Sequence, residues 1–180
     1  MAERQLDPQR LGDHVDRLYR AAWGLCGSRE DAEDLVQETY ARVLSRPRML
    51  RSDDDLGYLL RVLRNTFFSR HRTAQRRPQT EPFAEGMDPA DERSELQPAA
   101  ALEARDVFAV IAGLPPDFRD ALVAVDVAGL SYREAGKLLG ANEATITSRL
   151  HRARRQVAAA LRPDAEDRQP VGQESPSDGV

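Results

Sequence analysis

Apolar side chains recur at α-helical spacing along the first part of the chain, from about residue 10 to residue 77. The first predicted helix ends at Gly27, and its buried stripe consists of Leu11, Val15, Leu18, Ala22 and Leu25. Ser28 is a suitable N-cap for a second helix, because its hydroxyl can accept a hydrogen bond from the first turn. That helix is expected to end at Pro47 and to bury Leu35, Val36, Tyr40, Val43 and Leu44.

A polar loop, residues 48–55, precedes a third predicted helix over residues 56–72. The inward side of this helix consists of Leu59, Leu60, Leu63 and Phe67. Residues 78–100 are rich in acids and prolines and contain few large apolar side chains, which predicts a flexible linker. Residues 162–180 show no periodicity and predict a disordered tail. With no strand-like alternation, the pattern predicts an all-α fold of two small helical domains, residues 10–77 and 101–161.

The second domain contains the pattern of a helix-turn-helix over residues 130–159. Ser131 and Glu134 have the spacing of a capping box, and Gly140 and Asn142 supply a turn and a second N-cap. The inward-facing side chains of the first short helix are expected to be Tyr132, Ala135, Leu138 and Leu139. The second helix has a buried stripe of Ile146, Leu150, Ala153 and Val157.

The opposite face of this second helix predicts contact with DNA. It presents hydroxyl, imidazole and guanidinium groups, which can bind base edges and phosphates in a major groove: Thr147, Ser148, His151, Arg152 and Arg155. Arg149 and Arg154 lie at the flanks, where phosphates would lie. Within this set, Ser148, His151 and Arg152 are the main candidates for reading bases.

Charge is segregated along the chain. The formal net charge of −4 by itself argues against a nucleic-acid partner. However, residues 61–77 contain six arginines and no acid, and residues 142–162 contain five arginines and one acid. The acids gather between these segments, in residues 78–106. Two basic segments separated by an acidic connector predict two separate contacts with a polyanion.

Other features narrow the class of protein. No apolar run approaches about 18 residues, and the first ten residues do not have the pattern of a secretory signal. The lone Cys26 rules out an internal disulfide and a cysteine-based zinc site. These features predict a cytoplasmic protein without membrane insertion. No nucleophile–base pair, metal-ligand cluster or phosphate-binding glycine loop is present, so we expect no catalysis, no cofactor and no metal.

Several motifs are similar to those of a known family. The segments GLPPDFR (113–119), DVAGLSYRE (126–134) and SRLHRAR (148–154) resemble region 4 of extracytoplasmic-function (ECF) sigma factors, promoter-recognition subunits of bacterial RNA polymerase. The segments DAEDLVQETY (31–40) and LLRVLRNTF (59–67) resemble parts of their region 2. The order and spacing of the motifs fit, and the resemblance covers most of the chain.

The resemblance implies partners for particular residues. Region 2 would dock on the β′ clamp helices of the core polymerase through Asp34, Gln37 and Glu38, with Arg42 beside them. Its third helix would hold the melted minus-10 element through Arg61, Arg64, Asn65 and Arg72, with Phe67 in the core and Phe68 unassigned. Region 4 would read the minus-35 duplex and contact the β flap. An anti-sigma factor is a further implied partner.

The chain departs from the family pattern at Tyr58, where Trp is usual, at Gly136, where a larger residue is usual, and at Thr147, where Lys or Arg is frequent. Thr147 removes one cationic contact with the minus-35 element that the family pattern implies. A glycine within a helix costs about 1 kcal/mol relative to alanine, so we expect the helix around Gly136 to be marginal alone.

Two other functions fit parts of the pattern. A stand-alone repressor with a helix-turn-helix and a dimerisation unit would bind duplex DNA tightly without polymerase. A helical adaptor that binds only protein would leave the arginine-rich faces in solvent. Cys26 could sense oxidants, but a lone cysteine on an apolar helix face is more often simply buried. The acidic tail could fold over the recognition helix, but solvated disorder is the favoured interpretation.

Overall fold

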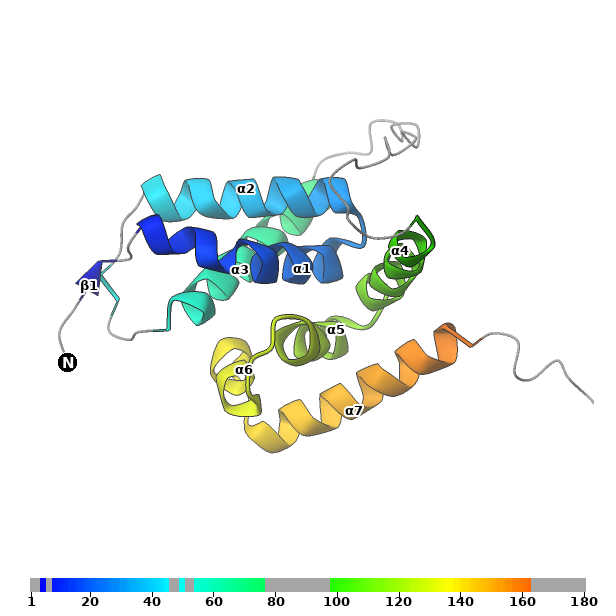
Figure 1. Ribbon diagram of the computed structural model, residues 1–180. Helices are drawn as coiled ribbons and strands as arrows, with labels where there is room; N and C mark the ends of the chain where they lie inside the picture. The colour runs from blue at the N-terminus through cyan, green and yellow to red at the C-terminus, as the bar shows by residue number, and fades with distance from the viewer. Residues whose placement is uncertain (1–3, 6–7, 46–48, 51–53, 77–97, 163–180) are drawn as a thin grey trace, which may run out of the picture.

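The structure is a computed structural model that describes residues 4–5, 8–45, 49–50, 54–76 and 98–162. The N-terminal half consists of a short 3-10 helix, η1 (Pro8–His14), and three α-helices: α1 (Val15–Cys26), α2 (Arg29–Ser45) and α3 (Asp55–Arg76). Helices α1 and α2 lie side by side, and α3 crosses behind them (Figure 1). The predicted linker, residues 78–100, and the predicted tail lie almost wholly outside the described residues.

The C-terminal half begins with α4 (Pro98–Ala112), which starts earlier than the sequence pattern indicates. It continues with α5 (Pro116–Leu122), which runs into a π-helical turn, η2 (Val123–Val127). Helices α6 (Tyr132–Leu139) and α7 (Glu143–Ala160) complete the helix-turn-helix. Figure 1 shows α7 along the lower edge of the molecule, with α5 between it and the N-terminal half.

The helix ends follow local chemistry. Gly27 ends α1 in the left-handed region, with φ of 83°, which glycine adopts without a Cβ clash. Ser28 Oγ then accepts a hydrogen bond from the backbone N–H of Asp31 at 3.2 Å, as an N-cap does. Pro116 occupies the first turn of α5, where its missing N–H costs nothing. The predicted helix end at Gly27 and the predicted N-cap at Ser28 are confirmed.

The predicted inward faces are mostly buried, and three positions are wrong. Val15 is 40% exposed, because the 3-10 helix before it turns with a different period and puts Leu11 and Val15 out of phase. Leu44 is 52% exposed in the last turn of α2. Tyr132, the first residue of α6, is 38% exposed. At both of these helix ends the periodic pattern continues past the packed part of the helix.

The all-α fold class is confirmed, with one small addition. Residues Arg4–Gln5 (β1) and Met49–Leu50 (β2) pair as antiparallel two-residue strands, with Arg4 opposite Leu50. The predicted loop 48–55 therefore includes a short strand. A segment of this length has no periodicity from which a strand could be predicted.

The two halves share one hydrophobic core. Helix α1 packs on α2 and α3 and also on α4 and η2, so it is covered from both halves. Its buried residues accordingly exceed one stripe: Leu18, Ala21, Ala22, Trp23, Gly24 and Leu25. The halves described above as separate domains are therefore in direct contact in this structure.

Candidate nucleic-acid interface

Helix α7 is held by its cap and by its buried stripe. Asn142 Oδ1 accepts a hydrogen bond from the backbone N–H of Thr145 at 2.7 Å, which confirms the predicted N-cap. Ile146, Leu150 and Ala153 are each at most 1% exposed, and Val157 is half-buried. These contacts fix which side of the helix faces solvent.

The capping box of α6 is also present. Ser131 Oγ accepts a hydrogen bond from Glu134 N at 3.3 Å, and Ser131 N donates to Glu134 Oε2 at 2.8 Å. Hydrogen bonds from the side chain and backbone of Ser131 lower the pKa of Glu134, so the carboxylate stays ionised. Gly140 then makes the turn with φ of 67°. Both helices of the motif thus begin at the predicted residues.

The outer face of α7 is exposed as the sequence predicts. The exposed side chains are Thr147, Ser148, His151, Arg152 and Arg155. The hydroxyls of Thr147 and Ser148 donate to backbone carbonyls of their own helix, at 2.9 and 3.0 Å. Their oxygen lone pairs remain able to accept hydrogen bonds from base amino groups.

The two flanking arginines are paired with acids of the same half. Arg149 Nη2 donates to Asp117 Oδ2 at 2.8 Å. Arg154 makes a bidentate contact with Asp126, at 2.9 and 2.7 Å, and this hydrogen bonding raises the pKa of Arg154 above its ordinary value. The pairs tie α7 to α5 and η2, so each guanidinium is held in one orientation.

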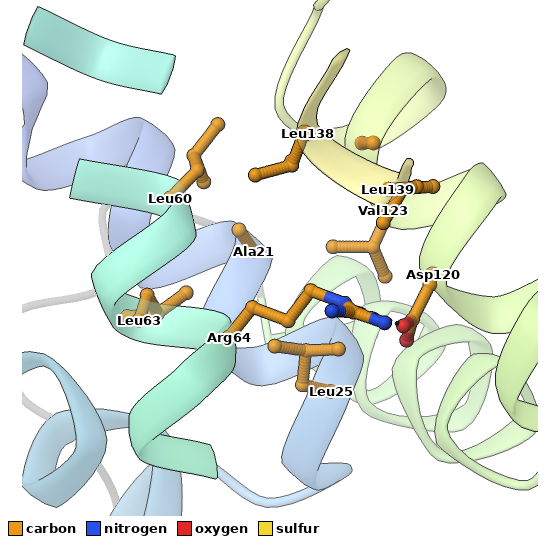
Figure 2. Close-up of a pocket in the computed structure, with 10 residues that line it drawn as sticks. Ala21, Leu25, Leu60, Leu63, Arg64, Asp120, Val123, Leu138 and Leu139 are labelled. Carbon is orange, nitrogen blue, oxygen red and sulfur yellow. Dashed lines mark hydrogen bonds and ion pairs between the residues drawn. The ribbon is translucent and has the colours of Figure 1, made fainter. Parts of the chain in front are cut away.

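The predicted minus-10 residues of α3 do not share one environment. Arg61, Asn65 and Arg72 are exposed. The side chain of Arg64 is 33% exposed, and its Nε donates to Asp120 Oδ2 on α5 at 2.8 Å. Figure 2 shows Arg64 reaching from α3 toward Asp120 across a small space between the two halves.

The aromatic residues of α3 divide between two roles. Phe67 is 6% exposed, which confirms its predicted place in the core. Phe68, which the sequence left unassigned, is half-buried, and the guanidinium of Arg64 lies 4.7 Å from its ring centroid. This is the distance of a cation–π contact. Phe68 therefore helps to position Arg64.

The predicted polymerase-binding face of α2 is exposed and charged. Asp34 and Gln37 are exposed, and Glu38 is partly exposed. Arg42 donates to Glu38 Oε1 at 2.6 Å, and Arg70 of α3 lies 3.9 Å from Asp34 and 3.8 Å from Glu38. The acids therefore stand beside two arginines.

Sequence reasoning missed the residues that join the two halves. Arg17 of α1 donates to the backbone carbonyls of Ala128 and Gly129, with its Nε 2.8 Å from Ala128 O. The rings of Trp23 and Phe108 stack with centroids 4.2 Å apart. Each contact joins positions far apart in sequence, so no local pattern reveals it.

Among the described residues we looked for a metal site and for a membrane-spanning helix. Within them, no group of three or more His, Cys, Asp and Glu side chains converges as metal ligands would. Among the same residues, no helix is long and apolar enough to cross a bilayer.

Comparison with known proteins agrees with this geometry. The family model for Sigma-70 region 2 matches residues 11–77, and the model for Sigma-70, region 4 matches residues 104–157. The chain therefore belongs to the sigma-70 family of RNA polymerase sigma factors, and within it to the ECF group. Its relatives include the ECF RNA polymerase sigma factor EcfG of Rhodopseudomonas palustris, 37% identical over 85% of this chain and 84% of the relative.

Another relative is the ECF RNA polymerase sigma factor SigE of Mycolicibacterium smegmatis. It is 38% identical over 80% of this chain, which spans 57% of the length of SigE. Among solved structures, the sigma factor RpoE of Bartonella quintana, in complex with the anti-sigma factor NepR, matches with a TM-score of 0.66 and 26% identity. That match covers 87% of this chain and 96% of RpoE.

Proposed function

We propose that the chain directs RNA polymerase to particular promoters. In this proposal the N-terminal half binds the core enzyme and the opened minus-10 strand, and the C-terminal half reads the minus-35 duplex. The observation that carries the proposal is the pair of family matches in chain order, joined to a capped helix-turn-helix with an exposed polar face on α7. The chain itself supplies no catalysis, because the polymerase carries out the chemistry.

The residue assignments rest on exposure and chemistry. We assign the minus-35 contacts to the outer face of α7, because a helix with one buried stripe and exposed hydroxyl and guanidinium groups fits a major groove. We assign the minus-10 contacts to Arg61, Arg64, Asn65 and Arg72 on α3. A melted strand needs a cationic track of this kind, with aromatic or apolar surface nearby. The core-binding face is assigned to Asp34, Gln37 and Glu38.

The proposal includes a regulator and a location. Because the related RpoE was solved in complex with the anti-sigma factor NepR, we propose that a protein of that class controls this chain as well. We also propose that the chain acts in the cytoplasm, where bacterial RNA polymerase works.

Arg152→Ala tests the role of α7. We expect run-off transcription by the chain with core polymerase to fall about 10-fold at a promoter with a minus-35 element, since one lost base or phosphate contact is worth about 1–3 kcal/mol. Binding to the core enzyme should not change. The control is Arg20→Ala, which removes an exposed arginine of α1 and the same charge, and should leave transcription intact.

The outcomes also separate the alternatives. Unchanged transcription in Arg152→Ala would contradict the assignment of α7. Tight, sequence-specific binding to duplex DNA without polymerase, combined with no stimulation of the core enzyme, would favour a repressor. If the chain binds protein partners but neither binds duplex DNA nor stimulates transcription, a helical adaptor would be favoured.

A further inference from the structure

The two flanking arginines of α7 are each held by an acid from the segment that packs against this helix. Arg154 Nε lies 2.9 Å and Arg154 Nη2 lies 2.7 Å from the two carboxylate oxygens of Asp126 in η2. Arg149 Nη2 lies 2.8 Å from Asp117 Oδ2 on α5. Helix α5 lies alongside α7 (Figure 1). Two arginines at the proposed DNA interface therefore already have anionic partners within the protein.

The pairing fixes these guanidinium groups without using them up. A guanidinium has five N–H groups, and Asp126 accepts hydrogen bonds from Nε and Nη2 of Arg154 only. The side chain of Arg154 is 54% exposed and that of Arg149 is 26% exposed. The remaining N–H groups can donate to a phosphate, but only from one direction. An unpaired arginine would keep its rotamer freedom and reach phosphates in many positions.

The position of Asp126 has no explanation within its own segment. It lies in the π-helical turn η2, where Ala128 N donates to Val123 O, five residues back, at 2.8 Å. Aspartate is a poor helix former, and π turns are frequent at functional sites. Asp117 differs, because the first turn of a helix favours an acid for electrostatic reasons of its own. The contact with α7 is therefore the main reason for Asp126.

Stability is a weak reason for either pair. Ion pairs this exposed contribute little to folding, because water screens the attraction and two long side chains lose freedom. Their effect on DNA is larger. Contacts between arginines and phosphates supply nearly all of the non-specific affinity of a protein for DNA. A phosphate that approaches Arg154 from the side of Asp126 is repelled by the carboxylate, so only the opposite approach is attractive.

We propose that Asp126, assisted by Asp117, sets the DNA specificity of α7. By fixing the flanking arginines, the two acids confine phosphate contact to the docking position in which α7 reads matching bases, and they weaken binding to unrelated duplex. Specificity is gained here by lowering the affinity for competitors. Both acids are positioning residues, because they act on DNA through Arg154 and Arg149. The proposal rests on the proposed function, since it takes α7 as the DNA-reading helix.

Binding of the full-length chain to random duplex DNA tests the proposal without polymerase. The probe is a fluorescein-labelled random duplex of about 20 base pairs, followed by anisotropy between about 50 and 200 mM NaCl. Asp126→Asn keeps the shape of the side chain and removes its charge. The matched control is Asp13→Asn, which removes an exposed acid of η1 and changes the net charge equally.

We expect Asp126→Asn to bind the random duplex about 5-fold more tightly at the lowest salt, and the slope of log K against log salt to steepen by about 0.9, the value of one added phosphate contact. Asp13→Asn should match the unaltered chain. Adding Arg154→Gln to Asp126→Asn should abolish the gain, because the released cation is then absent. An unchanged slope in a folded Asp126→Asn, or a gain that persists without Arg154, would overturn the proposal.

A second pair of variants covers the case in which Asp126→Asn loses its helical circular dichroism. The side chain of Asp117 is 68% exposed, so Asp117→Asn leaves the packing intact and releases Arg149. Arg149→Gln then serves as the second change, and the same criteria apply.

Competition in transcription tests the specificity itself. With core polymerase and a promoter used by the unaltered chain, we expect Asp126→Asn to retain transcription but to need about 5-fold less random duplex for half-inhibition, matching its tighter non-specific binding. Reduced transcription with unchanged sensitivity to competitor would overturn the role in specificity. If the unaltered chain stimulates no transcription, the proposed function fails, whereas the duplex assay still decides the role of the acids.

Discussion

At the scale of single residues, the arginines of this chain differ by their partners. Arg152 and Arg155 are exposed on α7. Arg149 and Arg154 are paired with acids 32 and 28 positions away, and Arg64 is paired with an acid 56 positions away. The sequence pattern places all five on basic helices and predicts the exposure of the first two. The pairings depend on tertiary packing, so local periodicity could not predict them.

Cys26 is the other residue whose role the structure decides. Burial, with a smaller contribution from the negative charge of Asp31, raises the pKa of its thiol to about 12. At pH 8 only about one thiol in ten thousand would be ionised, and the thiolate is the reactive form. The structure therefore opposes the idea that this cysteine senses oxidants.

Thiol labelling checks this conclusion. At pH 8 the folded chain should react with iodoacetamide about a thousand-fold more slowly than the same chain in urea, where the pKa returns to an ordinary value near 9. The unfolded state loses its proton first, so the raised pKa stabilises the fold below about pH 9. This stabilisation is lost as the pH rises toward 12. Equal labelling rates in the two states would show that the thiol is accessible and ionised.

At the scale of elements, the helix-turn-helix is the best-predicted part. Its caps join residues three positions apart, Ser131 with Glu134 and Asn142 with Thr145, so the sequence contains all the information they need. Gly136 is the exception. Sequence reasoning treats it as a weakness in α6, whereas a Cβ there would lie 2.6 Å from the carbonyl oxygen of Ala141. The glycine allows the turn to pack against the helix.

Gly136→Ala is therefore expected to destabilise the protein, although alanine is the better helix former. We expect the free energy of unfolding in urea to fall by about 1–2 kcal/mol, because overpacking outweighs the gain in helix propensity. Gly12→Ala is the control and should change it by less than about 0.5 kcal/mol, since nothing lies within 4 Å of the new Cβ. A Gly136→Ala variant as stable as the unaltered chain would refute the close-packing explanation.

At the scale of the whole molecule, the sequence predicts each half but not their contact. Amphipathic stripes identify the helices and the all-α class, because a stripe is a property of one element. This contact between the halves appears in the sequence only indirectly, in Gly24 and Trp23 on α1, neither of which the stripe of that helix explains. The contact also pairs Arg64 with Asp120 of the other half, whereas Arg61, Asn65 and Arg72 are exposed.

The central claim is that this chain selects promoters for RNA polymerase. It is tested most directly by transcribing a pool of fragments of the genome that encodes the chain with core polymerase, with and without the purified chain, and mapping the RNA 5′ ends. We predict new start sites that depend on the chain and share two sequence blocks, near positions −10 and −35, at a constant separation. No chain-dependent start sites, or start sites without a shared pair of blocks, would contradict the claim.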